Sequence, residues 1–331
     1  RKEKGWVEVI RYQSEYMYQP LVENLLQHRD KGTSCVLTQT NEEAVILMAL
    51  LRKHGINSKL VQSMDGLRFW NMAEMRYFLR HIDKRIKTPL ITEELWEEAK
   101  HNTFSTYDRS LSLMYVKRCV EQFEQTNKSK YFNDFKEFVF ESSVEDFCDV
   151  SGADVVVSTI HKAKGREFYD VYMLISDNYV KDAHLMRRYY VGITRAKNRL
   201  FIHTNSDCFN HLSADRYFMD QRQYDMPEEI VLQLSHKDVN LGFFKERKQE
   251  VLALRGGDSL IYNDFFLYSS STDKPIAKLS SRMQGTLSEW EQRGYKVQSA
   301  SVRFVVAWKP KDAPKDETET AVLLADLRLS L

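Results

Sequence analysis

A basic, glycine-containing segment follows an apolar run near the middle of the chain. Val155–Thr159 predicts a buried strand, and the side chains after it offer a hydroxyl, an imidazole and two ammonium groups at Thr159, His161, Lys162 and Lys164. Open parallel sheets bind ligands at the carboxyl ends of their strands. Donors at this position can contact the phosphates of a nucleic acid. Taken alone, the segment could equally be a solvated basic turn.

Two arginines seven residues apart form a second candidate group. Arg188 and Arg195 lie in a predicted helix that carries arginines at both ends and precedes a strand from Arg199 to Thr204. A planar, permanently charged guanidinium can stabilise the charge that develops on phosphate oxygens during phosphoryl transfer. The spacing predicts that both arginines share one helical face. The alternatives are an exposed arginine near a helix end for Arg195 and a surface ion pair for Arg188.

Charge is concentrated around these two groups. The 331 residues carry a net charge of only +1, which argues against a histone-like polycation. Between Thr159 and Arg199, however, the sequence contains nine Lys or Arg residues and only four Asp or Glu residues. The composition therefore permits a local basic groove.

Composition indicates a globular, non-membrane protein of more than one domain. Hydrophobic residues make up 43% of the chain, and no apolar stretch approaches the ~20 residues that cross a bilayer. The four cysteines form no C-x-x-C pair, so we expect neither a disulfide framework nor a metal site. A reducing cytoplasm fits this pattern. A chain of this length exceeds the ~250 residues at which single cores stop growing.

An amino-terminal β-α-β unit is predicted over residues 35–63. A strand at 35–40 leads into a helix from Asn41 to about Gly55, and a strand at 59–62 follows. Thr40 and Glu43 have the spacing of a capping box. This order of elements implies a parallel sheet.

The pattern then changes twice along the chain. Four helices are expected at 72–82, 90–100, 111–125 and 131–140, and strands resume at 154–159, 170–175 and 199–204. Residues 207–255 are expected to be helical or irregular. Strands are expected again at 259–262, 265–268, 296–308 and 320–324, with a mobile hairpin loop at 310–318.

Both candidate groups match known signatures. Residues 155–168 and 187–197 resemble the two most carboxy-terminal motifs of the UvrD/Rep-type superfamily 1 DNA helicases. The resemblance implies that Arg195 is the catalytic arginine finger, and that Glu167, Gly165 and Arg188 belong to the nucleotide side. It also implies that the loop carrying Thr159, His161, Lys162 and Lys164 touches single-stranded DNA.

A weaker signature of the same family appears at residues 38–41. The resemblance assigns Thr40 and Asn41 to the DNA-binding side, while Gln39 stands where the family usually has an arginine. On these residues alone, a simple helix cap is the favoured interpretation. Arg166 also departs from the family, which usually has an apolar residue there.

The sequence contains no phosphate-binding loop of the Gly-x-x-x-x-Gly-Lys-Ser/Thr type. Because the chain begins at Arg1, we expect that loop in a missing amino-terminal ATPase domain, which would bind most of the ATP and Mg²⁺. This chain alone is therefore expected to be inactive. The alternative is a non-enzymatic, helicase-derived module that binds DNA or protein.

The expected architecture is α/β, with a RecA-like parallel sheet flanked by helices. Residues 1–63 and 148–206 would form this domain, 64–147 an inserted helical subdomain, 207–257 a connector and 258–331 a small β-rich module. The expected partners are single-stranded or partly duplex DNA, and possibly a protein bound by the last module.

Overall fold

The computed structural model describes residues 5–28, 32–61, 68–148, 150–176, 183–270, 274–310 and 319–331. Two compact units are present. The first comprises Arg1–Gln62 and Asp149–Val231, and the second comprises Ser63–Cys148 and Leu232–Leu331. Each unit is therefore built from two separate stretches of chain.

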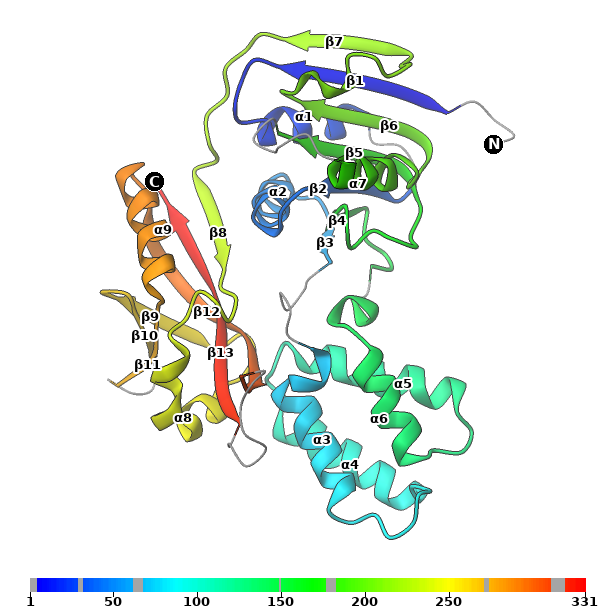
Figure 1. Cartoon of the computed structure of the whole chain (residues 1–331), viewed down its shortest axis with the longest axis vertical. Coiled ribbons are helices and arrows are strands. Elements are labelled where there is room, and N and C mark those ends of the chain that lie inside the picture. Colours follow the sequence, from blue (N-terminus) through cyan, green and yellow to red (C-terminus); the bar gives the residue numbers. More distant parts are fainter. Residues whose placement is uncertain are drawn as a thin grey trace. The chain divides into compact units, whose positions relative to one another are not determined.

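The first unit contains a seven-stranded sheet in the order β3-β4-β2-β5-β6-β1-β7, and its pairings are parallel (Figure 1). The predicted α/β class is confirmed. The strands are β1 (Trp6–Tyr12), β2 (Ser34–Thr38), β3 (Ser58–Leu60), β4 (Val155–Thr159), β5 (Phe168–Ile175), β6 (Ala196–Thr204) and β7 (Arg216–Asp220).

Helices cover both faces of this sheet. The helices are α1 (Tyr18–His28), α2 (Asn41–Lys53) and α7 (Ala183–Ile193). Leu185 and Tyr189 of α7 share a core cluster with Leu37 and Ile202. On the opposite face, His28 of α1 contacts the ring of Phe201 at 5.3 Å between ring centroids. The sheet is therefore shielded on both sides, which explains why β2 and β4 are apolar runs without alternation.

The predicted β-α-β unit is present. Helix α2 begins after Thr40, whose side chain accepts a hydrogen bond from the Glu43 amide in a complete capping box. Gly55 follows the helix with a φ of +71°, a left-handed conformation that glycine adopts without strain. Strand β4 lies between β2 and β3, so the two strands of the unit do not pair directly.

Four strands and helices within residues 6–28 and 216–233 were not predicted. Strand β1 lies between β6 and β7, and α1 follows it. Residues 207–255 were expected to lack strands, which is wrong, because β7 and β8 (Glu229–Gln233) lie in this range. Four of the five residues of β7 are exposed, so the strand lacks the apolar alternation that would mark it.

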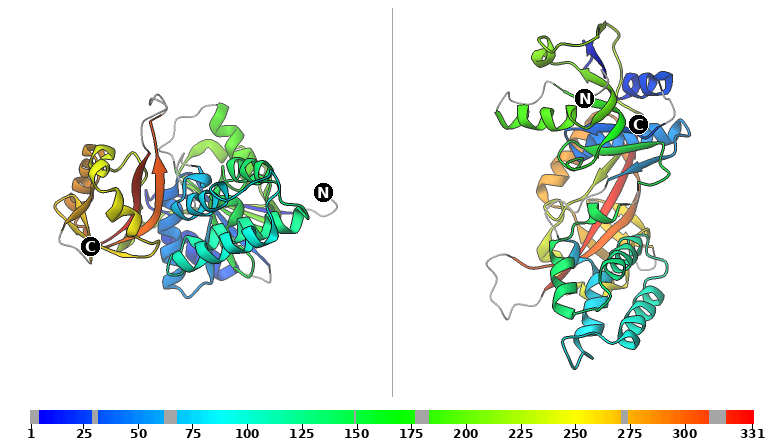
Figure 2. Two further views of the ribbon diagram at one scale, coloured as in Figure 1. Left: turned by 90° about the horizontal axis from the view of Figure 1, so that it is seen from below. Right: turned by 90° about the vertical axis from the view of Figure 1, so that its right-hand side faces the viewer.

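The second unit combines helices with an antiparallel sheet in the order β11-β10-β9-β12-β13-β8. Figure 2 shows the long β12–β13 hairpin in orange and red. The other elements are α3 (Ala73–Asp83), α4 (Glu93–Thr106), α5 (Leu113–Thr126), α6 (Phe132–Glu141), α8 (Lys248–Ala253), β9 (Ser259–Asn263), β10 (Phe266–Ser269), β11 (Pro275–Lys278), α9 (Ser281–Gln292), β12 (Lys296–Trp308) and β13 (Thr320–Ser330).

The four helices predicted between 72 and 140 are present as α3 to α6. Helix α9 was not predicted, although Ser280 caps it and Met283, Leu287 and Trp290 bury a stripe with helical spacing. Most of the loop expected at 310–318 lies outside the described residues.

The helical insertion and the carboxy-terminal β-module share one unit through a buried polar network. Glu74 of α3 accepts hydrogen bonds from the hydroxyls of Ser110 and Ser112, each at 2.7 Å. The Gly256 amide donates to the Ser110 hydroxyl at 2.9 Å. These contacts join segments that the sequence assigned to different domains.

Candidate functional site

The candidate residues divide between the two edges of the parallel sheet. Strand β4 ends at Thr159, whereas β5 begins at Phe168 and β6 at Ala196. Because parallel strands start at one edge and end at the other, the loop 160–167 runs from the carboxyl edge back to the amino edge. The predicted DNA-contacting and nucleotide-contacting groups therefore lie at opposite ends of one loop.

At the carboxyl edge, the loop begins with a tight turn. The carbonyl of Thr159 accepts hydrogen bonds from the amides of Lys162, at 3.0 Å, and Ala163, at 3.2 Å, and the amide of Ile160 donates to the carbonyl of Thr38 on β2. Thr159 is buried, whereas His161 and Lys164 are exposed. The turn thus presents an imidazole and an ammonium group to solvent.

The weaker motif at residues 38–41 contacts this turn through a hydrogen bond. The Lys162 ammonium donates to the side-chain carbonyl of Asn41 at 2.6 Å. The structure thus brings Asn41 and the basic loop together, although 121 residues separate them in sequence.

Thr40 acts as a helix cap, as its sequence pattern indicates. One carboxylate oxygen of Glu43 accepts from the amides of Gln39, at 2.9 Å, and Thr40, at 3.0 Å. Burial raises the pKa of Glu43, and the hydrogen bonds from Thr40 and Gln39 partly oppose that shift. The hydroxyl of Thr40 is already an acceptor for the helix, so its DNA-contacting role stays a prediction.

At the amino edge, Arg195 is anchored by main-chain carbonyls. Its Nε donates to the Val191 carbonyl at 3.0 Å, and one Nη donates to the Arg166 carbonyl at 3.1 Å. The Phe168 amide donates to the Arg195 carbonyl at 2.9 Å, which ties the end of the loop to the start of β6. The guanidinium is half-buried and held in a defined orientation.

The predicted placement of Arg188 and Arg195 on one helical face is wrong. Helix α7 ends at Ile193, and Arg195 lies in the turn before β6, with its amide bonded to the Gly192 carbonyl. Arg188 is exposed, and within the described ranges it makes no ion pair. Strand β6 must start at Ala196, so the helix cannot continue to Arg195.

Glu167 and Gly165 complete the amino-edge group. Glu167 is exposed and pairs with the Lys197 ammonium at 3.4 Å. Gly165 has a φ of +83°, and a Cβ added there would meet open space. The requirement for glycine at this position is therefore conformational rather than steric.

Helix α7 packs closely on β5 because of Gly192. A Cβ at this position would lie 2.6 Å from Cε of Met173. The glycine thus allows a close approach of helix and strand just before the turn that carries Arg195.

Gln39 is a structural residue that sequence reasoning missed. Its side-chain amide donates to the Tyr189 hydroxyl at 2.7 Å, and its carbonyl accepts from the amide of Ser176 at 3.3 Å and from its hydroxyl at 3.2 Å. Gln39 therefore links the ends of β2 and β5 to α7. The sequence showed only that Gln39 stands where the family usually has an arginine, and it gave no sign of these hydrogen bonds.

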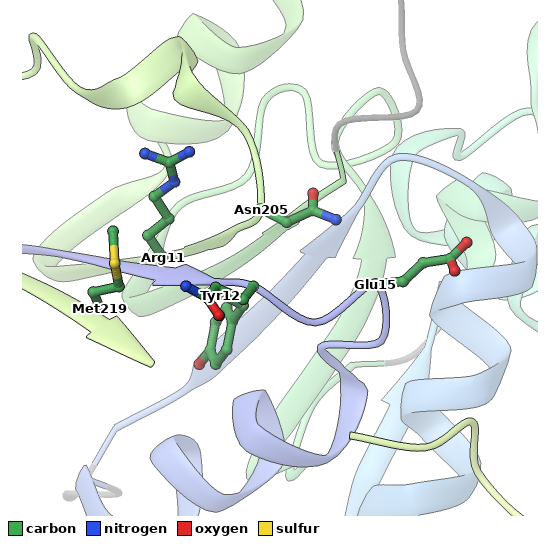
Figure 3. Close-up of a pocket in the computed structure, with 6 residues that line it drawn as sticks. Arg11, Tyr12, Glu15, Asn205 and Met219 are labelled. Atoms are coloured by element: carbon green, nitrogen blue, oxygen red, sulfur yellow. The ribbon is translucent and has the colours of Figure 1, made fainter. Parts of the chain in front are cut away.

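Two pockets open along the carboxyl edge. The larger, of about 410 Å³, lies at the ends of β1, β6 and β7 (Figure 3). It is lined by Arg11, Tyr12, Gln13, Glu15, Asn205 and Met219. The smaller, of about 190 Å³, includes Thr40, Glu42, Glu43 and Ser176 in its lining. Of the predicted site residues, only Thr40 lines either pocket.

Neither a metal centre nor a membrane span is found in the part of the chain that the structure describes. No group of three or more His, Cys, Asp or Glu side chains there could hold a metal ion. None of the helices described is both long and apolar enough to cross a bilayer.

Comparison with known protein families gives a match for one segment of the chain. Residues 88–207 match the family model of the UvrD-like helicase C-terminal domain. No curated protein matches the sequence. The structure is similar to the C-terminal domain of a possible DNA helicase from Lactobacillus plantarum WCFS1, with 12% identity, a TM-score of 0.33 and coverage of 66% of this chain and 86% of that one. It is also similar to VirB4 of Thermoanaerobacter pseudethanolicus, with 10% identity, a TM-score of 0.25 and coverage of 83% and 89%.

Proposed function

Because residues 88–207 match the family model of the UvrD-like helicase C-terminal domain, we propose that this chain is the carboxy-terminal part of an ATP-dependent DNA helicase or translocase of the cytoplasm. One observation carries the proposal. The first signature segment runs from the carboxyl edge of the sheet to the amino edge through the loop 160–167, where the Arg166 carbonyl accepts a hydrogen bond from Arg195 of the second segment. A movement at one edge can therefore be passed to the other through this loop.

On the nucleotide side, Arg195 is the arginine finger. Its guanidinium stabilises the negative charge that develops on the transferred phosphoryl group. Glu167 accepts a hydrogen bond from the nucleotide sugar, while Gly165 and Arg188 complete this side. Because the sequence contains no Gly-x-x-x-x-Gly-Lys-Ser/Thr loop, the proposal assigns the phosphate-binding loop and the ligands of Mg²⁺ to an ATPase domain outside these 331 residues.

On the DNA side, the turn after β4 contacts the phosphates of single-stranded or partly duplex DNA. His161 and Lys164 are exposed and supply donors, while Thr159 positions the turn through its carbonyl. The hydrogen bond between Lys162 and Asn41 fixes the turn against α2, next to Thr40. The same surface would close and open around DNA as nucleotide is bound and hydrolysed.

Binding of a fluorescent single-stranded oligonucleotide at low and high salt tests the DNA side with this chain alone. Affinity should fall steeply as salt rises, and each lost phosphate contact should lower the salt slope by about 0.7. The double variant His161→Ala, Lys164→Ala removes two such contacts and should therefore bind more weakly, with a slope lower by about 1.4.

A matched control removes the same side-chain types from the other end of the unit. Lys53→Ala, His54→Ala changes two exposed residues where α2 returns to the amino edge. This control should bind like the parent chain. If the His161 and Lys164 variant also binds like the parent, the DNA assignment is wrong, and a non-enzymatic protein-binding role becomes the better reading.

A further inference from the structure

Strand β10 of the second unit turns two aromatic side chains away from the core. It lies between β9 and β11 in the antiparallel sheet and pairs with both (Figure 1). Leu267 is fully buried, so its neighbours Phe266 and Tyr268 point to the opposite face of the sheet, because side chains alternate along a strand. Both rings are partly exposed. The outer face of these three strands therefore presents aromatic surface to solvent.

The register of the strands arranges this outer face in two rows. Directly opposed residues of antiparallel strands have their side chains on the same face. One row consists of Asn263, Phe266 and Lys278, and the other of Ile261, Tyr268 and Pro275. Residues two apart on a strand are separated by about 7 Å, so the rows run side by side at that spacing. These six side chains are called the β10 face below.

Two cations are held beside the aromatic rings. The ammonium of Lys278 lies 5.2 Å from the centre of the Phe266 ring, which also makes a T-shaped contact with Phe243 at 5.9 Å. The guanidinium carbon of Arg247 lies 5.6 Å from the centre of the Phe243 ring. Its Nε donates to the Pro275 carbonyl on β11 at 3.3 Å. Phe266 and Phe243 thus position positive charge along β11.

Charge differs between the two sides of the β10 face. On the β11 side, Lys274 is exposed and precedes the strand, so three cations belong to this side. On the β9 side, the exposed Asp264 lies in the two-residue turn that joins β9 to β10. An anionic chain that crosses the face is therefore expected to run along β11 and to avoid the turn.

The turn itself is strained. Asp264 and Phe265 have φ angles of +46° and +63°, a left-handed conformation that is unusual for a bulky aromatic residue. The Phe265 carbonyl accepts a hydrogen bond from the Leu279 amide at 2.9 Å, which fixes the turn next to the end of β11. Backbone strain of this kind is concentrated at functional sites. The turn thus holds the border of the β10 face in one geometry.

We propose that the β10 face binds single-stranded DNA, with one base stacked on the ring of Tyr268. Ile261, which is exposed by 56%, and Pro275 flank that ring in its row and offer apolar surface to the base. The phosphates lie along β11, close to Lys278 and Arg247. Aromatic rings with cations beside them bind single strands because every base has a flat face and every phosphate a charge.

Tyr268 is assigned the stacking role because Phe266 already contacts Lys278 and Phe243. An acidic protein would match the cations equally well, but it would gain nothing specific from an aromatic ring. The choice of DNA as the nucleic acid rests on the proposed function. The site itself is separate from the turn after β4, which belongs to the first unit.

Titration of a fluorescent oligothymidine tests the proposal in the chain that already carries His161→Ala and Lys164→Ala. Binding in this background should persist. Tyr268→Leu keeps an apolar side chain but removes the ring, so affinity should fall about tenfold without a change in salt slope. Tyr268→Phe keeps the ring and should bind like the background chain. Lys278→Gln should lower the salt slope by about 0.7, since it removes one phosphate contact.

Two matched controls come from the helical insertion of the same unit. Tyr131→Leu removes a tyrosine that is exposed by 45%, and Lys128→Gln removes an exposed lysine. Both controls should bind like the background chain, and circular dichroism should show that all variants are folded. Equal affinities of Tyr268→Leu and Tyr268→Phe would overturn the proposal. Displacement of the oligonucleotide by polyglutamate at equal charge concentration would also overturn it, because the face would then take an acidic protein.

The two DNA assignments can fail separately. If the turn after β4 is misassigned, His161→Ala, Lys164→Ala binds like the parent chain, while Tyr268→Leu still weakens binding. If the β10 face is misassigned, the background chain binds no oligonucleotide, or Tyr268→Leu changes nothing. Photocross-linking of an oligonucleotide that carries 5-iodouracil locates the stacked ring directly. The cross-linked peptide should contain Tyr268, and its absence among the cross-linked peptides of the background chain would count against the β10 face.

Discussion

The anchoring of Arg195 allows its proposed catalytic contribution to be separated from its structural one. Arg195→Ala removes two donors from the carbonyls of Val191 and Arg166. Because the side chain is half-buried, water can replace part of each bond, and the expected loss of folding free energy is about 1–2 kcal/mol. For a unit of this size, the melting temperature should fall by about 2–8 °C.

The expected catalytic loss is much larger. In a polypeptide that also carries the phosphate-binding domain, Arg195→Ala should reduce the rate of ATP hydrolysis by about a thousandfold or more. That corresponds to about 4 kcal/mol of transition-state stabilisation. Arg195→Lys should recover only a small part, because an ammonium is a point charge without the planar fork that reaches both carbonyls. DNA binding should remain near normal in both variants.

The assay is DNA-stimulated ATP hydrolysis well below the melting temperature, with thermal melting and oligonucleotide binding measured on the same preparations. Arg52→Ala is the control, since Arg52 is an exposed arginine in the last turn of α2, and it should change none of these quantities. An alanine variant of Arg195 that hydrolyses ATP at the parental rate but melts earlier would refute the reasoning. Arg195 would then be a structural residue that only ties the loop 160–167 to β6.

Two further predictions concern stability. Thr40→Ala removes the capping hydroxyl of α2 and should lower the free energy of unfolding by about 1 kcal/mol, seen as a lower urea midpoint with an unchanged slope; an unchanged midpoint would contradict the capping role. Burial lowers the pKa of His203 to about 3, so below pH ~6.5 the unfolded chain binds a proton that the folded chain does not. The free energy of unfolding should therefore fall by about 1.4 kcal/mol per pH unit as pH drops from 6.5 towards 3. His203→Gln should lose this pH dependence. If the free energy of unfolding falls with pH equally in both proteins, His203 is not its source.

Local signals made part of the fold predictable. The capping box of Thr40 and Glu43 is a short-range pattern, and it placed the start of α2 correctly. Strands β2 and β4 were recognised because strands covered on both faces read as continuous apolar runs. Once β4 was recognised as a strand of a parallel sheet, the motif residues that follow it could be placed at the carboxyl edge.

Other elements depend on partners distant in sequence. Strand β1 pairs with β6 and β7, so its register joins Val7 to Leu200 and Glu8 to Arg216. No pattern within residues 6–12 could reveal those neighbours. The end of α7 before Arg195 is set by the start of β6, which is a constraint of the sheet rather than of helix propensity. Tertiary context therefore decided the elements that the sequence did not predict.

Position 39 shows how a departure from a family motif can be built into a fold. An arginine has five donors and no acceptor, so it could not accept the hydrogen bonds that the amide and hydroxyl of Ser176 give to the Gln39 carbonyl. A glutamine both donates and accepts, and its amide reaches the Tyr189 hydroxyl on α7 at the same time. The residue that would supply a cation is thus replaced by one that joins the carboxyl edge to the helix preceding Arg195. In the proposed motor, this neutral link adds a second physical connection between the DNA side and the nucleotide side, beside the loop 160–167.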